Sequence, residues 1–320
     1  MDDIKQIRKS INVCRAIAKK ANANFSHAAS LLPLKKRDFF YATYAAMRVI
    51  DDHVDEKFLI LSSDDRKKYR SSYLNMLNDW LYQVCDSDSQ HLNGPLDANI
   101  VTSIQHTCGR SNMGTNPWRN LAEALKGDIE ERTMETWDDF LEYCEGATVS
   151  PATIFIYLSA ATYNGNEGYK YCLDKDPRYF AKNLAIYCYI VHILRDLGKD
   201  AKKTPRLVTI PLEILQDAEL DRESIYQELK NKSKKINTLA ENLITRAEVY
   251  KCKGHIALTE LIPKLGVRES MALTGLIRVY DHLFGLAKEN TFNLLANGPA
   301  LESKVRGEIL KKHPIITETM

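Results

Sequence analysis

The sequence predicts an all-α protein, and two observations support this prediction. Apolar residues recur at intervals of three and four through most of the 320 residues, which is the pattern of amphipathic helices. The 14 glycines and 10 prolines cluster between long amphipathic stretches, where they would separate helices. We find no alternating runs joined by a tight turn, so we expect no β-hairpin.

The expected helices follow from this periodicity and from the positions of the helix breakers. They cover residues 2–21, 25–31, 35–53, 64–84, 94–107, 117–129, 136–145, 149–163, 177–197, 212–216, 221–250 and 256–295. Breaks are expected at Leu32–Pro33, 86–95, 109–117, 164–168 and 198–211, with a further break near Pro263–Gly266. No repeat, low-complexity tract or Ser/Gly linker divides the chain, which favours one domain over residues 1–320.

The composition is that of an ordinary globular protein. Hydrophobic residues make up 44% and charged residues 27%, and the net charge of +2 gives no reason to expect nucleic-acid binding. The seven cysteines form no CxxC pair, which is typical of free thiols in a reducing cytosol. No stretch approaches the roughly 18 apolar residues of a membrane span. We therefore expect a cytoplasmic protein.

The first chemically informative segment is FFYATYAAMRVIDDHVDE, residues 39–56. At roughly 100° per residue, one narrow stripe of this helix carries four polar side chains: Tyr44, Arg48, Asp51 and Asp55. The rest of the helix is almost entirely apolar, which is typical of a buried helix.

Two buried carboxylates four residues apart repel each other and need a cation. Carboxylate oxygens suit Mg²⁺, which commonly completes its ligands with substrate phosphate oxygens. The alternative is a solvated acidic helix end, because Asp52 and Glu56 lie beside the pair. This motif alone leaves both interpretations open.

A second pair, Asp196 and Asp200, follows another apolar helix in AIYCYIVHILRDLGKDAKK. Tyr189 and His192 fall on the same stripe, and Gly198 is a candidate end or bend of the helix. The alternative is an ordinary helix C-terminus with mixed charges, although acids there oppose the helix dipole. If the two pairs face each other across a bundle core, they would hold two or three Mg²⁺ ions that clamp a diphosphate.

These segments resemble the squalene and phytoene synthases, which are head-to-head trans-prenyltransferases. NFSHAASLLPLKKRDFFYATYAAMRVIDDHVD is similar to the family's first aspartate block, and HILRDLGKD is similar to its second. Between them, Gly127–Glu131 followed by FLEYCEG resembles the segment that leads to a YC-containing helix. RVYDHLF near the end resembles the helix that carries a late tyrosine.

The resemblance implies a single-domain helical bundle of the isoprenoid-synthase type with a central cavity. It also implies that two prenyl diphosphates, such as farnesyl or geranylgeranyl diphosphate, couple through a cyclopropyl diphosphate to a squalene- or phytoene-type product. The implied Mg²⁺ ligands are Asp51, Asp55, Asp196 and Asp200. The implied contact to the diphosphate comes from Arg48, Arg195 matches the family's arginine before the second pair, and the implied catalytic side chains that line the cavity are Tyr44, Tyr143 and Tyr280. Beyond the resemblance, Tyr189 and Arg206 are candidate substrate contacts and His192 is a candidate catalytic side chain, with a solvated loop as the alternative for Arg206.

The sequence departs from the family pattern close to the second pair. Tyr189 and His192 stand where relatives commonly carry Gln and Asn. Two interpretations of His192 stay open, a ligand or base and a core histidine with a satisfied partner. In RLVTIP, residues 206–211, Arg206 and Pro211 remain but the loop tyrosine of the family does not, which bears on the second half-reaction.

Two other classes of function remain as alternatives. One is a terpene cyclase or chain-elongating prenyltransferase, which also uses aspartate-rich helices, although the second block here is not DDxxD. The other is a non-catalytic helical assembly factor, although such relatives often lose one aspartate pair. Use of NADPH is left open, as are substrate chain length, oligomeric state and peripheral contact with a membrane, where an apolar substrate would reside.

Overall fold

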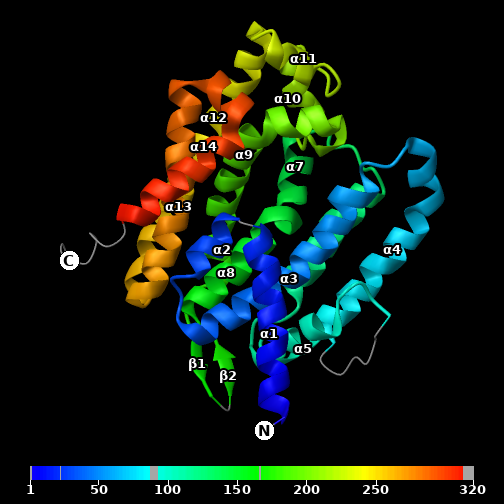
Figure 1. Cartoon of the computed structure of the whole chain (residues 1–320). Helices are drawn as coiled ribbons and strands as arrows, with labels where there is room; N and C mark the ends of the chain where they lie inside the picture. The colour runs from blue at the N-terminus through cyan, green and yellow to red at the C-terminus, as the bar shows by residue number, and fades with distance from the viewer. Residues whose placement is uncertain (1, 22, 87–92, 166, 313–320) are drawn as a thin grey trace. The chain divides into compact units, whose positions relative to one another are not determined.

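The computed structural model describes residues 2–21, 23–86, 93–165 and 167–312, and it confirms the all-α fold (Figure 1). The α-helices are α1 (Asp2–Ala21), α2 (Asn24–Ala29), α3 (Leu34–His53), α4 (Ser63–Cys85), α5 (Ala98–His106), α6 (Asn116–Ile129), α7 (Trp137–Cys144), α8 (Ser150–Ala160), α9 (Pro177–Lys203), α10 (Leu212–Asp217), α11 (Ile225–Lys230), α12 (Lys234–Leu261), α13 (Val267–Glu289) and α14 (Thr291–Lys312). In the part of the chain that the structure describes, no helix combines the length and apolarity needed to cross a membrane.

The chain divides into two compact units. Unit 1 comprises Met1–Arg132, Glu145–Ala181 and Leu261–Ala272, and unit 2 comprises Thr133–Cys144, Lys182–Glu260 and Leu273–Met320. The boundaries fall inside α9 and α13, so both units contribute to these helices. One domain over the whole chain, with a central cavity, stays a prediction.

Unit 1 is built around α3, which α1 and α5 pack against (Figure 1). Phe39, Ala42, Ala46 and Ile50 of α3 are buried, as the apolar pattern of this helix predicts. Trp80 of α4 is fully buried, and its indole N–H donates to the carbonyl of Ala46 at 2.9 Å. This bond satisfies the polar atom of a core tryptophan and joins α4 to the helix of the first aspartate pair.

The expectation of no β-hairpin was wrong. Strands β1 (Thr162–Asn164) and β2 (Gly168–Lys170) pair antiparallel, and Asn164 stands opposite Gly168. Gly168 has a φ of 79°, and a Cβ there would lie 1.9 Å from the carbonyl oxygen of Arg110. The Asn164–Gly165 dipeptide at the end of β1 is a common turn signal, and it outweighed the helical periodicity that had predicted a helix through residue 163.

Helix α9 is longer than the predicted helix 177–197. It continues to Lys203, so Asp196 and Asp200 both lie on regular helix, and the carbonyl of Asp200 accepts the N–H of Thr204 at 2.9 Å. Gly198 therefore does not end this helix. A Cβ at Gly198 would lie 2.4 Å from the carbonyl oxygen of Leu295 in α14, so the glycine permits close helix packing instead.

The prediction of one continuous helix over residues 221–250 was wrong, because the structure has two helices there. Lys232 adopts a φ of 50°, and its N–H bonds to the carbonyl of Leu229, which closes α11 before α12 begins at Lys234. Helix α12 then runs without interruption to Leu261. The expected break near Pro263–Gly266 is confirmed by a 3₁₀ turn at Ile262–Lys264. Of the predicted break at 86–95, residues 87–92 lie outside the described part of the chain.

Two π turns continue helices at positions that carry predicted site residues. The turn Val54–Phe58 extends α3 and contains Asp55, and the N–H of Leu59 bonds to the carbonyl of Val54 at 2.9 Å. The turn Glu145–Val149 continues α7, whose last turn carries Tyr143. Such turns are frequent at functional sites, and they displace side chains from ideal α-helical positions. The stripe calculated for a straight α-helix therefore does not hold at Asp55.

In unit 2, α14 approaches the backbone of α9 very closely. A Cβ at Gly298 would lie 2.0 Å from the carbonyl oxygen of Arg195, and Gly198 faces Leu295 in the same way. Leu295, Gly298 and Glu302 are spaced three and four residues apart, so they share one face of α14. The two glycines therefore allow contact between helix backbones beside the second aspartate pair.

We predict that Gly298→Ala destabilises the protein, because the added methyl must displace backbone in a packed contact. We expect a loss of about 1–3 kcal/mol in the free energy of unfolding, as for overpacked cores. At Gly307, on the same helix, a Cβ would meet no atom within 4 Å, so Gly307→Ala should stabilise by about 0.5–1 kcal/mol. Urea unfolding of both variants measures the difference, and equal effects would contradict the close packing.

Candidate functional site

The first aspartate pair lies at the C-terminal end of α3 and in the π turn that follows it. Arg48 is close to two acids one helical turn ahead, with Nη1 3.5 Å from Oδ2 of Asp51 and Nη2 in contact with Oδ1 of Asp52. Tyr44, one turn before, is half-buried and stacks on Phe40 with ring centroids 5.4 Å apart. Tyr44, Arg48 and Asp51 thus occupy successive turns of one helix, as the spacing predicted.

Asp55 is electrostatically different from its neighbours. Among the described residues, no side chain forms a hydrogen bond or ion pair with its carboxylate. Burial raises the pKa of Asp55 well above its usual value, and the charges of Asp51, Asp128 and Glu56 raise it further. Arg48 opposes this shift but does not cancel it. Asp55 therefore lies in a negative potential that Arg48 does not offset.

The second pair lies on α9 and is also asymmetric. Arg195 donates to Asp196 through two parallel bonds, Nε to Oδ1 and Nη2 to Oδ2, both at 2.8 Å. Nε2 of His192 is 3.2 Å from Oδ2 of the same carboxylate. Burial alone would raise the pKa of Asp196, but the bonds from Arg195 and His192 outweigh burial and hold it well below its usual value.

Asp200 corresponds to Asp55 in the first pair. No side chain in the described ranges forms a hydrogen bond or ion pair with it. Burial raises the pKa of Asp200, and the charge of Asp196 raises it further, while Lys199 is the strongest of the cations that oppose the shift. Each pair thus contains one carboxylate bound to an arginine and one that is desolvated beside another acid.

An aromatic row in unit 2 leads toward the second pair. Tyr189 stacks on Phe140 at 5.9 Å between ring centroids, and Tyr143 lies 6.4 Å from Tyr189. The ring centroid of His192 lies 6.0 Å from that of Tyr189. The hydroxyl of Tyr189 is hydrogen-bonded to Oγ1 of Thr209 at 3.0 Å. Three of the predicted site residues therefore form a continuous aromatic surface on α7 and α9.

The remaining predicted residues are less directly placed. Tyr280 of α13 is buried, and its hydroxyl interacts electrostatically with Arg195, so the two side chains are near neighbours. Arg206 lies in the 3₁₀ turn Pro205–Leu207 and is exposed, with its N–H 3.4 Å from Oγ1 of Thr204.

The carboxylates fit Mg²⁺ better than a metal that needs a complete protein cage. Within the described ranges, no three or more His, Cys, Asp or Glu side chains are arranged to enclose a metal ion. Mg²⁺ needs no such cage, because it keeps several waters and takes one or two carboxylates plus phosphate oxygens. The desolvated carboxylates Asp55 and Asp200 are groups that a divalent cation would stabilise. The residues present therefore fit Mg²⁺ at each pair.

Three residues near the pairs were missed by the sequence analysis. Asp128 adds to the negative potential at Asp55, Thr209 binds the hydroxyl of Tyr189, and Glu302 contacts Arg195. Asp128 lies within the segment Gly127–Glu131 that resembled the family, which was the available signal. Thr209 stands two residues before Pro211, where the family has its loop tyrosine. Glu302 had no sequence signal, because its contact depends on the packing of α14.

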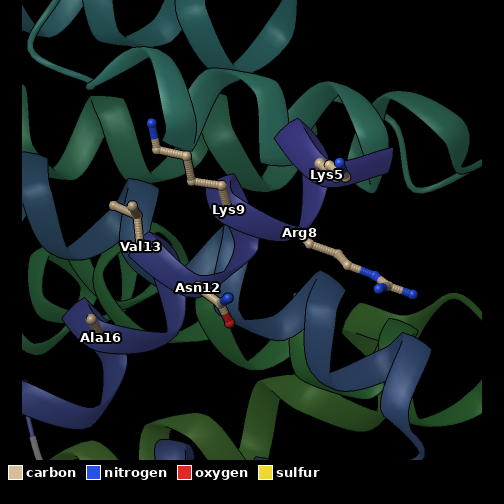
Figure 2. A pocket seen from close by; sticks show the side chains of 6 residues that line it. All are labelled: Lys5, Arg8, Lys9, Asn12, Val13 and Ala16. Atoms are coloured by element: carbon tan, nitrogen blue, oxygen red, sulfur yellow. The ribbon is translucent and has the colours of Figure 1, made fainter. Parts of the chain in front are cut away.

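An open hollow of about 570 Å³ lies along α1. Figure 2 shows its lining side chains, which are Lys5, Arg8, Lys9, Asn12, Val13 and Ala16. The lining contains no carboxylate and none of the predicted site residues, so this hollow is not part of the candidate site.

Comparisons with known proteins agree with these features. The sequence profile of the squalene/phytoene synthase family matches residues 18–294. The 4,4'-diapophytoene synthase of Staphylococcus haemolyticus (strain JCSC1435) is 23% identical over 194 residues, which cover 61% of this chain and 60% of that protein. The phytoene synthase of Arthrospira platensis is 25% identical over 201 residues, which cover 61% of this chain and 59% of that protein. The chain thus matches only about three-fifths of the length of these relatives.

A solved structure shows the same fold. The crystal structure of a dehydrosqualene synthase in complex with ligand superposes with a TM-score of 0.67 over 98% of this chain and 99% of that one, at 20% sequence identity. At that identity the likeness concerns the fold alone, whereas the profile match extends over most of the sequence. Because of that match, the chain belongs to the squalene/phytoene synthase family, a family of prenyltransferase enzymes.

Proposed function

We propose that this protein couples two prenyl diphosphates head to head in a Mg²⁺-dependent reaction. The product would be of the squalene or phytoene type, formed through a cyclopropyl diphosphate with release of diphosphate. The observation that carries the proposal is the desolvated, unpaired carboxylate in each aspartate pair, Asp55 and Asp200, on a chain that belongs to this family.

The proposed role of both pairs is to bind the cation that accompanies the diphosphate. When bound, Mg²⁺ would neutralise the charge that develops on the leaving diphosphate. Asp51 and Asp55 would supply oxygen ligands at the first pair, and Asp196 and Asp200 at the second. Arg48 is half-exposed and held by carboxylates on one side, so its guanidinium is suited to bind phosphate oxygens as well.

The aromatic row has a separate role in the proposal. Tyr143, Tyr189 and His192 offer aromatic faces, which stabilise nearby cations, and their apolar bodies exclude water from a carbocation. The phenol of Tyr189 is bonded to Thr209, the residue at the position of the missing loop tyrosine. We infer that Tyr189 supplies from α9 the hydroxyl that relatives supply from the loop. Quenching of the final carbocation by hydride from NADPH, in place of proton loss, stays open.

The direct test is to measure diphosphate release and products with farnesyl and geranylgeranyl diphosphate. We expect release only with Mg²⁺, and a C30 or C40 product, or its cyclopropyl diphosphate, by mass spectrometry. Asp51→Ala and Asp196→Ala should each lower the rate by at least about 10³-fold, because charge stabilisation of the leaving group is lost. Parallel reactions with NADPH would reveal any reduction step.

Exposed Asp64→Ala is a suitable control, because Asp64 lies in the first turn of α4 and forms no part of either pair. Its activity should equal that of the unaltered protein. A folded protein that releases no diphosphate from either substrate would refute the enzymatic proposal. A linear product elongated head to tail, or a cyclised monomer, would instead identify one of the two alternative reactions.

Asp55→Asn should increase the stability of the metal-free protein while abolishing activity. A carboxyl with a raised pKa in the folded state stabilises the fold when protonated, and this contribution is lost as pH rises above its unfolded pKa of 3.8. At pH 7 the carboxyl of Asp55 is therefore less favourable in the folded protein than in the unfolded chain, and replacing it with a neutral amide should raise the Tm of the metal-free protein by about 2 °C or more.

Asp52→Asn is the matched control for this prediction. Asp52 is adjacent but forms an ion pair with Arg48, so its neutralisation should not raise the Tm. Scanning calorimetry in EDTA measures both variants. A Tm for Asp55→Asn at or below that of the unaltered protein would show that the carboxylate is already compensated.

Tyr189→Phe should preserve the first release of diphosphate and slow the second. The metal ligands stay intact, but the hydroxyl bonded to Thr209 is lost, so the cyclopropyl diphosphate should accumulate. Product analysis by mass spectrometry measures the ratio of intermediate to final product. Tyr82→Phe, on the exposed face of α4, should leave that ratio unchanged. An unaltered ratio in Tyr189→Phe would remove this tyrosine from the second half-reaction.

A further inference from the structure

Arg195 bridges two carboxylates that come from different helices. Its Nε and Nη2 atoms donate to Asp196 on α9, and its Nη1 atom is bonded to Oε1 of Glu302 on α14. All three side chains are largely shielded from water, with 10%, 7% and 14% of their respective side chains exposed. In such surroundings charge interactions are strong, so each group affects the others substantially.

This arrangement matters because Arg195 opposes metal binding. A guanidinium that is hydrogen-bonded to both oxygens of Asp196 compensates the negative charge that would otherwise attract a metal cation. Glu302 adds a negative charge on the opposite edge of the guanidinium. It therefore offsets Arg195 and leaves Asp196 and Asp200 with net attraction for a cation.

The position of Glu302 is fixed by the backbone contact between α14 and α9. Gly298 lies one turn before Glu302, against the carbonyl oxygen of Arg195, and Leu295 lies against Gly198. Because these residues share one face of α14, the contact at Gly298 directs Glu302 toward Arg195. Apart from its first residues, α14 lies beyond residue 294, where the match with the family profile ends.

We propose that Glu302 is a positioning residue for the second aspartate pair. It holds the Arg195 guanidinium in place and offsets its charge, so that Asp196 and Asp200 can bind a divalent cation. This role adds to the metal ligands that the family implies. It depends on α14, most of which lies beyond the residues that the family profile matches. The inference rests on the proposed function only in assigning the cation site to Asp196 and Asp200.

The test measures Mn²⁺ binding to the second pair without relying on turnover. The substitutions Asp51→Asn and Asp55→Asn are made in the full chain to remove the first pair. The EPR signal of free Mn²⁺ then measures how much Mn²⁺ this variant binds, with and without inorganic pyrophosphate. We expect Glu302→Gln to weaken Mn²⁺ binding roughly tenfold in this background, about 1.4 kcal/mol. Glu302→Asp, which retains the charge, should recover part of the loss.

Two controls separate positioning from simple packing. Glu308→Gln removes the same charge from an exposed position of α14 and should leave Mn²⁺ affinity unchanged within twofold. Asp200→Asn should abolish the Mn²⁺ binding that remains in the double variant. Thermal unfolding of each variant in EDTA measures how far the substitution changes the stability of the metal-free protein.

The proposal is overturned if Glu302→Gln lowers the Tm but leaves Mn²⁺ affinity unchanged, because Glu302 then acts only in packing. It is also overturned if the double variant shows no Mn²⁺ binding that depends on Asp200. A different outcome would refute the proposed function and leave the role of Glu302 intact. Mn²⁺ binding that depends on Glu302, in a protein that releases no diphosphate, would keep the positioning role and refute the prenyltransferase assignment.

Discussion

The unsatisfied negative charge of Asp55 and Asp200 is the constraint on which the rest of the candidate site depends. A desolvated carboxylate is stable only when it is protonated, paired or bound to a cation, and partial burial and neighbouring acids raise the pKa of both Asp55 and Asp200. Their acidic partners Asp51 and Asp196 each interact with an arginine. The fold thus maintains two places where a divalent cation would be stabilising.

The backbone contact between α9 and α14 is the second element of this arrangement. Glycines at Gly198 and Gly298 bring the two helices closer than any side chain would permit. This contact leaves the carboxylate of Glu302 beside the guanidinium of Arg195, which is bonded to Asp196. Packing and electrostatics are therefore linked here, because a change in helix separation would also change the charge around the second pair.

The sequence predicted the helical class and most helix positions, because periodicity and local spacing depend on neighbours along the chain, while the metal-binding role of both aspartate pairs stays a prediction. It did not predict the hairpin at β1 and β2, where a local turn signal outweighed helical periodicity. The π turn at Asp55 was also missed, since an ideal α-helix was assumed. Glu302 could not be found from local patterns, and the position of Thr209 before Pro211 did not indicate its contact with Tyr189. Their contacts join residues 107 and 20 positions apart, respectively, and exist only after the helices pack.

The two arginines beside the pairs have different environments, and these favour different roles. Arg48 pairs with both Asp51 and Asp52, and in each pair the side chains are 36% and 41% exposed, so these pairs contribute little to stability. Arg48 can therefore move to a phosphate at small electrostatic loss. The Arg195–Asp196 pair is bidentate with 10% and 7% exposed, and separating it would leave a buried charge unpaired. Arg48 thus suits a substrate contact, whereas Arg195 suits a fixed support for Asp196, and the similarity of the two motifs in sequence conceals this division.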